Sequence, residues 1–475
     1  MKLGKILVNI PNELEDIELL GVTDDSRKVT KGSVFVCVKG PVSDGHDYAL
    51  KAVQSGASVV VCERDLGLKN QIIVNDTHKA LAQLSEAVYG FPLKKLKVIG
   101  VTGTNGKTSV CTMIREILEH SGYKTGVIGT VANIIGEEVL PAKNTTPGTV
   151  ELRELFSKMV EAGCEYAVME VSSHALDQRR VEGITFEAGV FTNLTQDHLD
   201  YHLTMENYFE AKKKLFSMSK TAIINIDDEY GVKLLSDITE KVATYSIKND
   251  NATFTAKNIR YKADGVNYEM VGFGIIGRVQ LKIAGAFSVY NSLAAGVCAK
   301  ELGLPINEIT EALSEVQGVK GRAEVVPTGR DFTVIIDYAH TPDGLQNILR
   351  TFRDIPKNRL VVLFGCGGDR DTTKRPKMGA IAARLADFVI VTSDNPRTEN
   401  PEDIIKDITA GMKSIATPYK VIENRIKAIK FAIANAKSGD IIVLAGKGHE
   451  TYQIVGKDTL HLDEREVVYE ALAEL

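Results

Sequence analysis

The sequence predicts an α/β protein built from several units, with a phosphate-binding loop in the middle one. Three observations lead to this fold class: a length of 475 residues, near-continuous apolar runs that alternate with helical patterns, and a glycine-rich loop between a strand and a helix. A chain of this length is expected to form roughly three domains. Apolar strands alternating with helices are typical of parallel sheets that are covered on both faces.

Composition excludes several classes of protein. Hydrophobic residues make up 44% and charged residues 25% of the chain, and the formal net charge of −5 is spread without a basic stripe or a Lys/Arg tract. Nucleic-acid binding and membrane-surface binding are therefore not indicated. No apolar run approaches the roughly 20 residues of a membrane span, and no signal peptide is predicted. The scattered cysteines lack a CxxC pair, which favours reduced thiols. We expect a cytoplasmic monomer.

The first unit is predicted for residues 1–95, with strand-like runs at 33–38, 57–62 and 72–74. Residues 91–95 are the expected linker to a second unit over 96–323. A third unit is predicted for 324–475, and its apolar strands are expected at 333–336, 360–364, 388–391 and 441–444.

Residues 100–109, Gly-Val-Thr-Gly-Thr-Asn-Gly-Lys-Thr-Ser, form the most informative stretch. An apolar run at 97–101 precedes them and a helical pattern follows, which is the context that a phosphate-binding loop needs. Gly103 and Gly106 let backbone N–H groups approach phosphate oxygens at the positive end of the helix. An ordinary glycine turn is the alternative.

Lys107 and Thr108 follow the second glycine of this loop. Lys107 is placed to reach the outer phosphates of a nucleotide, and the hydroxyl of Thr108 is placed to bind Mg²⁺. Val101 stands where the standard spacing has a glycine, so the loop is a shortened variant.

Three polar clusters follow apolar runs in the second unit, where open α/β sheets bind their ligands. Glu170 ends the run 166–170 and is a candidate Mg²⁺ ligand, although a lone Glu there is usually solvated. Residues 192–202 hold two histidines and two aspartates, which suggests a metal or phosphate site; alternatively a helix starts here, capped by Asn193 or Thr195. Residues 210–216 on their own indicate a basic surface helix.

Together these motifs resemble the Mur ligase family, ATP-dependent amino-acid ligases of peptidoglycan precursor synthesis. The series is Gly-Thr-Asn-Gly-Lys-Thr-Ser at 103–109, Met-Glu-Val-Ser-Ser-His at 169–174, Asn-Leu-Thr-x-Asp-His-Leu-Asp-Tyr-His at 193–202 and Ala-Lys-x-x-Leu-Phe at 211–216. The chain is most similar to members that add the third residue to UDP-N-acetylmuramoyl-L-alanyl-D-glutamate. The resemblance implies an N-terminal UDP-sugar-binding domain, a central P-loop-type ATPase domain and a Rossmann-like C-terminal domain that binds the amino acid.

The family reaction gives the second-unit residues expected roles. ATP converts the substrate carboxylate to an acyl phosphate, which an amine then attacks, so catalysis is mostly positioning and charge neutralisation. The resemblance implies that Lys107 holds the β- and γ-phosphates and that Thr108 and Glu170 bind one Mg²⁺, with Glu170 and His198 at a second. Lys212 matches the family lysine that reacts with CO₂ to form a carbamate (N6-carboxylysine), an oxygen ligand for Mg²⁺. Lys213 and Lys214 are expected to be only solvated.

Further nucleotide contacts are implied at the junction of the second and third units. Asn291 resembles the asparagine that contacts adenine. Arg322 offers a guanidinium to the transferring phosphate, although Lys320 replaces a family proline just before it. Asp337 and His340 are expected near the nucleotide when the domains close. With the loop, the implied ATP-binding set is Gly103, Thr104, Asn105, Gly106, Lys107, Thr108, Ser109, Asn291, Arg322, Asp337 and His340.

The UDP-linked substrate is expected to contact two units. Ser26, Arg27 and His46 resemble uridine-nucleotide contacts in the first unit. The positions that resemble diphosphate and dipeptide contacts are Thr145, Thr146, Ser172, Gln178 and Arg180. Turn and cap chemistry is the alternative interpretation of such short polar stretches.

Residues 392–397, Thr-Ser-Asp-Asn-Pro-Arg, indicate which amino acid is added. Arg397 offers a planar fork to a carboxylate, and Asp394 and Asn395 can receive an ammonium group. This motif resembles the version in members that take meso-diaminopimelate. Lysine lacks the second carboxylate and would leave Arg397 buried and unpaired, which favours its rejection. The implied pocket comprises Arg370, Asp394, Asn395, Pro396, Arg397, Gly446 and Glu450.

Other functions remain as alternatives. The nearest are a member that adds L-lysine and a ligase like folylpolyglutamate synthetase. An ATP-hydrolysing binding protein would not need an amino-acid pocket. A dinucleotide site at Gly365-x-Gly367-Gly368 is disfavoured because Arg370 stands where that fingerprint needs glycine or alanine.

Overall fold

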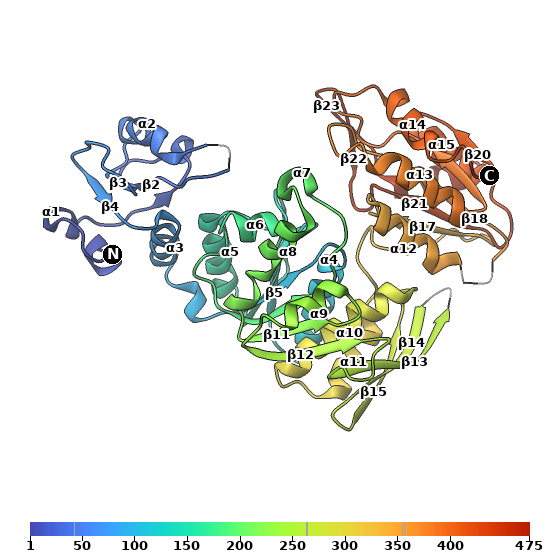
Figure 1. Cartoon of the computed structure of the whole chain (residues 1–475), viewed down its shortest axis with the longest axis horizontal. Coiled ribbons are helices and arrows are strands. Elements are labelled where there is room, and N and C mark those ends of the chain that lie inside the picture. Colours follow the sequence, from blue (N-terminus) through green and yellow to red (C-terminus); the bar gives the residue numbers. More distant parts are fainter. Residues whose placement is uncertain (42, 263–264, 354, 356) are drawn as a thin grey trace.

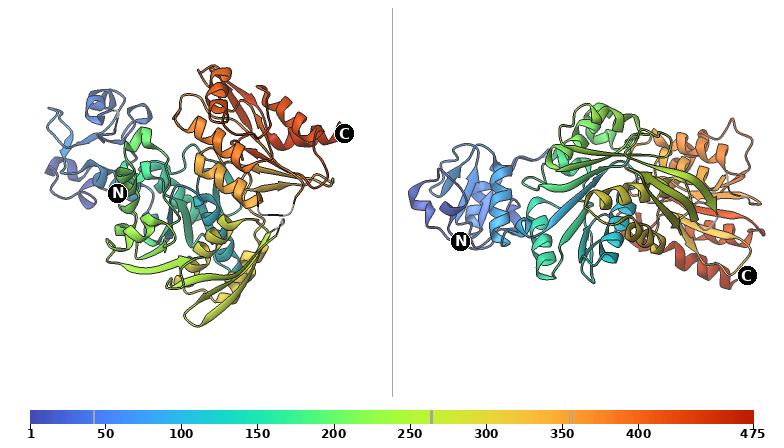
Figure 2. Two further views of the ribbon diagram at one scale, coloured as in Figure 1. Left: turned by 45° about the vertical axis from the view of Figure 1, so that its right-hand side comes forward. Right: turned by 90° about the horizontal axis from the view of Figure 1, so that it is seen from below.

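The computed structural model describes residues 1–41, 43–262, 265–353, 355 and 357–475. It has three units: the N-terminal unit lies at one end, the central unit in the middle and the C-terminal unit at the other end (Figures 1 and 2). Each unit contains its own sheet, so the predicted three-unit α/β architecture is confirmed. The exact boundaries at residues 95 and 323 stay predictions.

The N-terminal unit has a parallel sheet that is covered by one helix on each face. Strand side chains alternate, so Val34 and Val36 pack with α3 (Thr77–Val88), whereas Phe35 packs with α2 (Ala49–Gln54) on the opposite face. Within the described residues, the strands in sheet order are β1 (Val22–Thr23), β2 (Val34–Val36), β3 (Val59–Cys62) and β4 (Gln71–Ile73). The short elements are η1 (Leu3–Lys5), α1 (Asn12–Glu15), η2 (Ser26–Lys28), η3 (Gly45–Tyr48) and, in the predicted linker, η4 (Pro92–Lys94).

The central unit has a larger, mixed sheet. In the described part of the chain its strand order is β15-β14-β13-β12-β11-β10-β5-β9-β6-β7-β8. The strands are β5 (Lys97–Thr102), β6 (Thr125–Ile128), β7 (Ala132–Ile135), β8 (Glu138–Pro141), β9 (Tyr166–Glu170), β10 (Phe186–Phe191), β11 (Thr221–Asn225), β12 (Lys241–Ser246), β13 (Phe254–Lys262), β14 (Gly265–Gly272) and β15 (Ile275–Leu281).

The expectation of parallel strands holds in the middle of this sheet but not at its two edges. Strands β13 to β15 and β6 to β8 pair antiparallel, while the strands between are parallel. Phe273 and Gly274 join β14 to β15, and both have positive φ, as a two-residue hairpin turn requires. Hairpins need no crossover helix, so consecutive strands pair directly with one another at these edges.

Helices cover both faces of the parallel middle. Side chains of α4 (Lys107–His120), α10 (Ala286–Glu301) and α11 (Ile306–Glu315) share one core with Ile99 and Val101 of β5. Side chains of α5 (Thr149–Glu161) and α8 (Met205–Lys213) share the other core with Val98. The remaining helices of this unit are α6 (Ser173–Asp177), α7 (Leu199–His202), η5 (Phe216–Met218) and α9 (Glu229–Leu235).

The C-terminal unit is a parallel sheet with one antiparallel edge strand. Among the described residues its order is β16 (Glu324–Val326), β17 (Thr333–Asp337), β21 (Ile441–Ala445), β18 (Leu360–Phe364), β19 (Phe388–Val391) and β20 (Tyr419–Val421), with β16 antiparallel. One face packs against α12 (Pro342–Arg353), α13 (Lys374–Leu385) and α14 (Pro401–Ala410); the other packs against α15 (Arg425–Ala434) and α16 (Glu464–Ala473). A separate hairpin is formed by β22 (Tyr452–Val455) and β23 (Asp458–His461).

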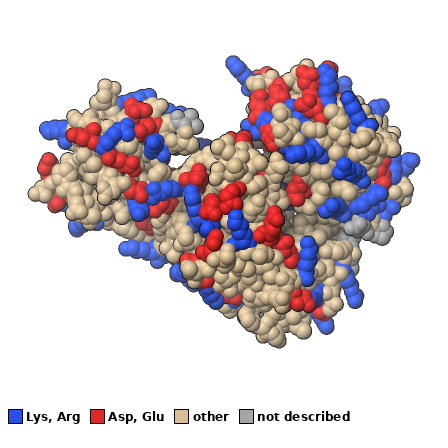
Figure 3. Space-filling view, viewed as in Figure 1, with Lys and Arg blue, Asp and Glu red and all other residues tan. Residues whose placement is uncertain are grey.

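Acidic and basic side chains alternate over the face shown in Figure 3, without a continuous basic stripe. Among the described residues, no helix combines the length and the apolar character needed to cross a bilayer.

Candidate active site

The phosphate-binding loop lies between β5 and α4, as predicted. Gly103 and Gly106 have φ of +147° and +89°. A Cβ on Gly103 would lie 1.9 Å from the Thr192 hydroxyl oxygen, and one on Gly106 would lie 2.5 Å from Asn291 Oδ1. Both positions therefore require glycine. The neighbouring loop holds this backbone in place, because Asn193 Oδ1 accepts a 2.9 Å hydrogen bond from the Asn105 N–H.

Polar side chains converge at the start of α4. The Lys107 ammonium donates to the carbonyls of Gly103 and Thr104 at 2.9 and 2.8 Å. Burial lowers its pKa, and nearby Glu170 opposes that shift. The Thr108 hydroxyl donates to Glu170 Oε1 at 2.9 Å. Glu170 is 1% exposed, so it is not a solvated strand end.

Lys212 on α8 is buried against the phosphate loop. Its Nζ donates to the Gly103 carbonyl at 2.8 Å and lies 4.5 Å from the ring centre of Tyr208. The residue is 2% exposed, so the basic-surface-helix interpretation is wrong at this position. Burial and the charge of Lys107 hold the pKa of Lys212 well below its usual value. Lys213 and Lys214 do lie at the surface, where they pair with Asp237 and Asp177.

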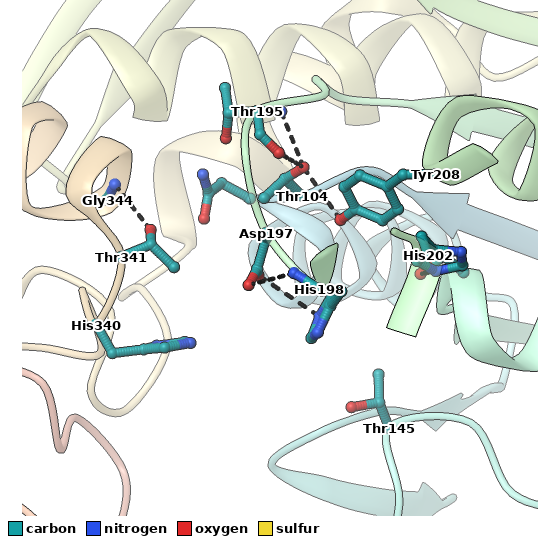
Figure 4. Close-up of polar contacts among 12 residues, drawn as sticks. Thr104, Thr145, Thr195, Asp197, His198, His202, Tyr208, His340, Thr341 and Gly344 are labelled. Carbon is teal, nitrogen blue, oxygen red and sulfur yellow. Dashed lines mark hydrogen bonds and ion pairs between the residues drawn. The ribbon is translucent and has the colours of Figure 1, made fainter. Parts of the chain in front are cut away.

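The polar loop after β10 lies across the phosphate loop (Figure 4). The Thr104 hydroxyl, the Tyr208 hydroxyl and the backbone of Thr195 are joined by hydrogen bonds. The predicted cap at Asn193 or Thr195 is wrong: α7 begins at Leu199, and His198, with φ of +52°, precedes it without a side-chain cap. Asn193 instead binds the phosphate loop.

His198 belongs to a group of rings in edge-to-face or tilted contact that also contains His174, His202, Tyr201 and Tyr208. The rings of His174 and His198 meet edge to face at 4.8 Å between centres. Burial lowers the pKa of His202 to about 4, and its Nε2 lies 2.9 Å from the Ser173 hydroxyl. This imidazole is therefore neutral at neutral pH.

The junction with the C-terminal unit carries Arg322 and Asp337. The Arg322 guanidinium stacks 4.7 Å from the ring centre of Tyr338, and its buried Nε has no hydrogen-bond partner among the described residues. Asp337 accepts from the N–H groups of Ala323 and Ala339 at 2.7 and 2.8 Å, and burial raises its pKa. Asp337 therefore anchors this junction.

Three adjoining cavities connect these groups. One of about 210 Å³ contains the phosphate loop, Glu170, His198 and Lys212. One of about 140 Å³ lies between Asn291 and the C-terminal unit, and it shares Asn105, Gly106 and Ser109 with the first. One of about 460 Å³ separates the central and C-terminal units and shares Asp197, His198, Tyr338 and His340 with the first. In Figure 4, His340 points across this space toward Asp197 and His198.

The loop after β19 lines the 460 Å³ cavity. Asp394 and Asn395 are 8% and 4% exposed, and Arg370, Gly446 and Glu450 line the same space. Arg397 departs from the prediction that it is buried: it is half-buried and already donates to the Gly368 carbonyl at 2.8 Å. Pro396 lies within this loop but does not line the cavity.

Lys447 was not predicted from the sequence, yet it holds two residues that line the 460 Å³ cavity, Asn395 and Glu450. Its side chain is fully buried, and its Nζ donates to Glu450 Oε2 at 2.8 Å and to Asn395 Oδ1 at 3.3 Å. The fully buried pair Arg425 and Glu464 was also missed; Arg425 donates to the carbonyl of Ala445 at 2.9 Å. The signal for Lys447 was its place between two glycines directly after the apolar strand β21.

The expected dipeptide contacts gather beside Glu170. The Thr146 hydroxyl donates to the Glu170 carbonyl at 2.8 Å, and Arg180 donates to the Thr146 carbonyl at 2.9 Å. Thr145 and Ser172 line the 210 Å³ cavity. Gln178 Oε1 accepts from Arg180.

The expected uridine contacts lie in the N-terminal unit, away from these cavities. Arg27 is exposed and pairs with Asp25, and Ser26 begins η2. His46 is 6% exposed, with Nδ1 2.5 Å from Asp44 and Nε2 accepting from the Glu63 N–H at 3.0 Å. Both its ring nitrogens already have partners, so a ligand contact here would come from its backbone.

The donor set fits Mg²⁺ held largely by nucleotide phosphates. In the described part of the chain, no three His, Cys, Asp or Glu side chains converge as a metal site. The Thr108 hydroxyl and Glu170 carboxylate are hard oxygen donors, and Mg²⁺ typically takes one or two carboxylates together with substrate phosphates.

Asp343 links the phosphate loop to the C-terminal unit, and its removal provides a test. Its Oδ2 accepts from Asn105 Nδ2 at 2.8 Å and from the Thr195 hydroxyl at 3.3 Å. We expect Asp343→Ala to raise the KM for ATP about tenfold to thirtyfold, since it removes two hydrogen bonds that contribute about 1 kcal/mol each. Asp343→Asn keeps an acceptor oxygen and should stay within about twofold of the unaltered chain. Steady-state kinetics with varied ATP would measure both; equal values for the two variants would contradict the linking role.

Comparisons with known proteins agree with this geometry. Three family models match: "Mur ligase family, catalytic domain" over residues 18–89, "Mur ligase middle domain" over 101–299 and "Mur ligase, glutamate ligase domain" over 321–448.

Similar full-length proteins include the UDP-N-acetylmuramoyl-L-alanyl-D-glutamate–2,6-diaminopimelate ligase 1 of Clostridium acetobutylicum, 47% identical with 100% of both chains covered. The corresponding ligase of Bacillus velezensis is also 47% identical, with 100% of this chain and 99% of that protein covered. A solved structure of a ligase with this name superposes with a TM-score of 0.75 at 32% identity, covering 100% of this chain and 99% of the other. The identity, the coverage and the three matched domains together place this chain in the Mur ligase family.

Proposed function

We propose that this chain is an ATP-dependent ligase that joins meso-2,6-diaminopimelate to the D-glutamate carboxylate of UDP-N-acetylmuramoyl-L-alanyl-D-glutamate in peptidoglycan precursor synthesis. The observation that carries the proposal is the 460 Å³ cavity, because Asp394, Asn395 and Arg397 face Asp197 and His198 across it. An amino-acid pocket thus opens onto the cavity that contains the phosphate loop. The relatives named as diaminopimelate ligases support the same substrate pair.

The nucleotide roles follow from the positions of the phosphate loop and its neighbours. Lys107 would hold the outer phosphates of ATP, Asn291 would contact the adenine, and Arg322 would offer charge to the transferring phosphate. The unpartnered Nε of Arg322 supports that role.

Mg²⁺ would be held by Thr108 and Glu170, with His198 and a carbamate on Lys212 as further ligands, and it would neutralise phosphate charge. Carbamate formation joins the neutral Lys212 amine to CO₂ through a new N–C bond and releases a proton. The lowered pKa of Lys212 supports this step, because the neutral amine is the form that reacts.

The substrate would bind across two units, with Ser26, Arg27 and His46 near the uridine end. Thr145, Thr146, Ser172, Gln178 and Arg180 would hold the diphosphate and the dipeptide. A cytoplasmic location and a monomeric state stay predictions.

Addition of L-lysine is the second candidate, and the half-buried state of Arg397 is the observation that favours it. A guanidinium that solvent already reaches rejects lysine less strongly than a buried one does. A folylpolyglutamate synthetase-like function has no such observation in its favour.

The decisive experiment measures phosphate release from ATP with UDP-N-acetylmuramoyl-L-alanyl-D-glutamate and either amino acid at matched concentration. We expect strong stimulation by meso-diaminopimelate and little by L-lysine. Preference for lysine would keep the ligase reaction and overturn the proposed amino acid. Stimulation by neither would contradict the ligase proposal.

A further inference from the structure

The N-terminal unit meets the central unit where α3 packs beside α5 (Figure 1). A cavity of about 200 Å³ lies at this contact, lined by residues that include Lys79 and Glu86 of α3 and Arg153 of α5. Arg153 is 1% exposed, and its Nε lies 3.6 Å from Glu86 Oε2. Val150 of α5 packs against the apolar core of the N-terminal unit, so this interface combines apolar contacts with polar ones.

Arg179 provides a direct polar link across the same interface. Its Nη2 donates to Asp76 Oδ2 at 2.8 Å, and Asp76 is the residue that caps the N-terminus of α3. Its Nε donates to Glu182 Oε2 at 2.9 Å within the central unit. The guanidinium thus joins one carboxylate in each unit.

The position of Arg179 in the chain connects this link to the proposed dipeptide site. It lies between Gln178 and Arg180, the proposed dipeptide contacts, which are hydrogen-bonded to each other. Its φ is +54°, a left-handed conformation that is unfavourable for a residue with a Cβ. The side chain that reaches Asp76 of the N-terminal unit therefore belongs to the same segment as the proposed dipeptide contacts.

We propose that Arg179 is a positioning residue whose ion pair with Asp76 sets the separation between the uridine-binding surface and the dipeptide site. The inference rests on the proposed function, in which one substrate contacts both units. When a ligand is bound at two linked sites, the second contact adds to the affinity only if the distance between the sites matches the ligand. A correct separation would hold the D-glutamate carboxylate beside the phosphate loop.

Two isosteric variants distinguish the ion pair of Arg179 with Asp76, which crosses the interface, from its ion pair with Glu182, which lies within the central unit. Asp76→Asn removes the charge that pairs with Arg179 but keeps a capping oxygen for α3. Glu182→Gln makes the same chemical change on the partner within the central unit. Arg179→Lys keeps the positive charge.

The variants are assayed with two acceptors: UDP-N-acetylmuramoyl-L-alanyl-D-glutamate, and the N-acetylmuramoyl dipeptide that lacks the uridine diphosphate. We expect Asp76→Asn to raise the KM for the full substrate about threefold with kcat unchanged, the size that a partly exposed ion pair supports. Its KM for the short acceptor should equal that of the unaltered chain. Glu182→Gln should change neither KM, and Arg179→Lys should stay within about twofold of the unaltered chain for the full substrate.

Other outcomes overturn the inference in distinguishable ways. An equal rise in KM for both acceptors would show a general structural role for the Asp76 pair. No change in Asp76→Asn, or the same change in Glu182→Gln, would show that the cross-unit pair does not position the substrate. Failure of the unaltered chain to ligate either acceptor would overturn the proposed function, and this inference with it.

Discussion

Replacing Lys212 with alanine should lower the rate of ligation by at least about a thousandfold, because it removes the proposed carbamate, a charged ligand for Mg²⁺ beside the phosphate loop. The side chain is 2% exposed and donates to the Gly103 carbonyl at 2.8 Å, so no other lysine can take its place without moving α8. The measurement is phosphate release with all three substrates present.

Two neighbouring lysines at the end of α8 supply the control. Lys213 and Lys214 are 32% and 48% exposed and pair with surface carboxylates. Lys213→Ala and Lys214→Ala should change the rate less than about twofold, since exposed pairs contribute little. Near-normal ligation by Lys212→Ala would contradict its proposed role.

Chemical rescue distinguishes a carbamate from an ammonium at this position. A small carboxylate such as acetate or formate can occupy the space vacated in Lys212→Ala and supply oxygen ligands, whereas methylamine supplies a cation. We expect partial recovery of the rate with the carboxylates and none with methylamine. Recovery with methylamine alone would contradict the carbamate.

The contrast between Lys212 and its neighbours shows what local sequence contains and what it lacks. The three adjacent lysines carry the same local signal, and by pattern alone all of them belong to a surface helix. Lys212 is buried by Gly103 and by Tyr208, whose hydroxyl contacts Thr104 across 104 positions of sequence. Only the series of family motifs distinguished Lys212 from Lys213 and Lys214; the periodicity of the helix did not.

The buried strands of all three units were predictable, because a parallel strand covered on both faces is a continuous apolar run. The antiparallel edge strands β13 to β15 lack such runs; along β15, buried and exposed residues alternate.

Site residues whose partners are distant in sequence were not predictable. Asn193 was a plausible helix cap, but its side-chain oxygen accepts a hydrogen bond from the N–H of Asn105, 88 positions away. Lys447 was missed because its partners, Asn395 and Glu450, only come together when β19 and β21 lie in one sheet.

Arg397→Ala should lower kcat/KM for meso-diaminopimelate about a hundredfold, since truncating one partner of a charge-assisted pair costs about 2–5 kcal/mol. The rate with L-lysine should not change, because lysine has no second carboxylate for this guanidinium. The selectivity for meso-diaminopimelate over L-lysine would therefore fall, because kcat/KM falls only for meso-diaminopimelate. The measurement is kcat/KM for each amino acid at saturating ATP.

Arg397→Lys tests whether the planar fork matters beyond its charge. Arg397 has φ of +52°, and its Nη1 donates to the Gly368 carbonyl at 2.8 Å. That hydrogen bond fixes one side of the guanidinium and leaves the remaining N–H groups for a carboxylate. A lysine ammonium cannot keep both contacts in one plane, so we expect about a tenfold loss for meso-diaminopimelate.

Arg384→Lys, an exposed position on α13, is the matched control and should change nothing. Because Arg397 is only half-buried, an unpaired guanidinium costs little in the lysine complex. Lysine therefore binds more weakly chiefly because it lacks the carboxylate that would pair with Arg397. Selectivity that survives Arg397→Ala would assign the recognition of the second carboxylate to Arg370, whose guanidinium lines the same cavity.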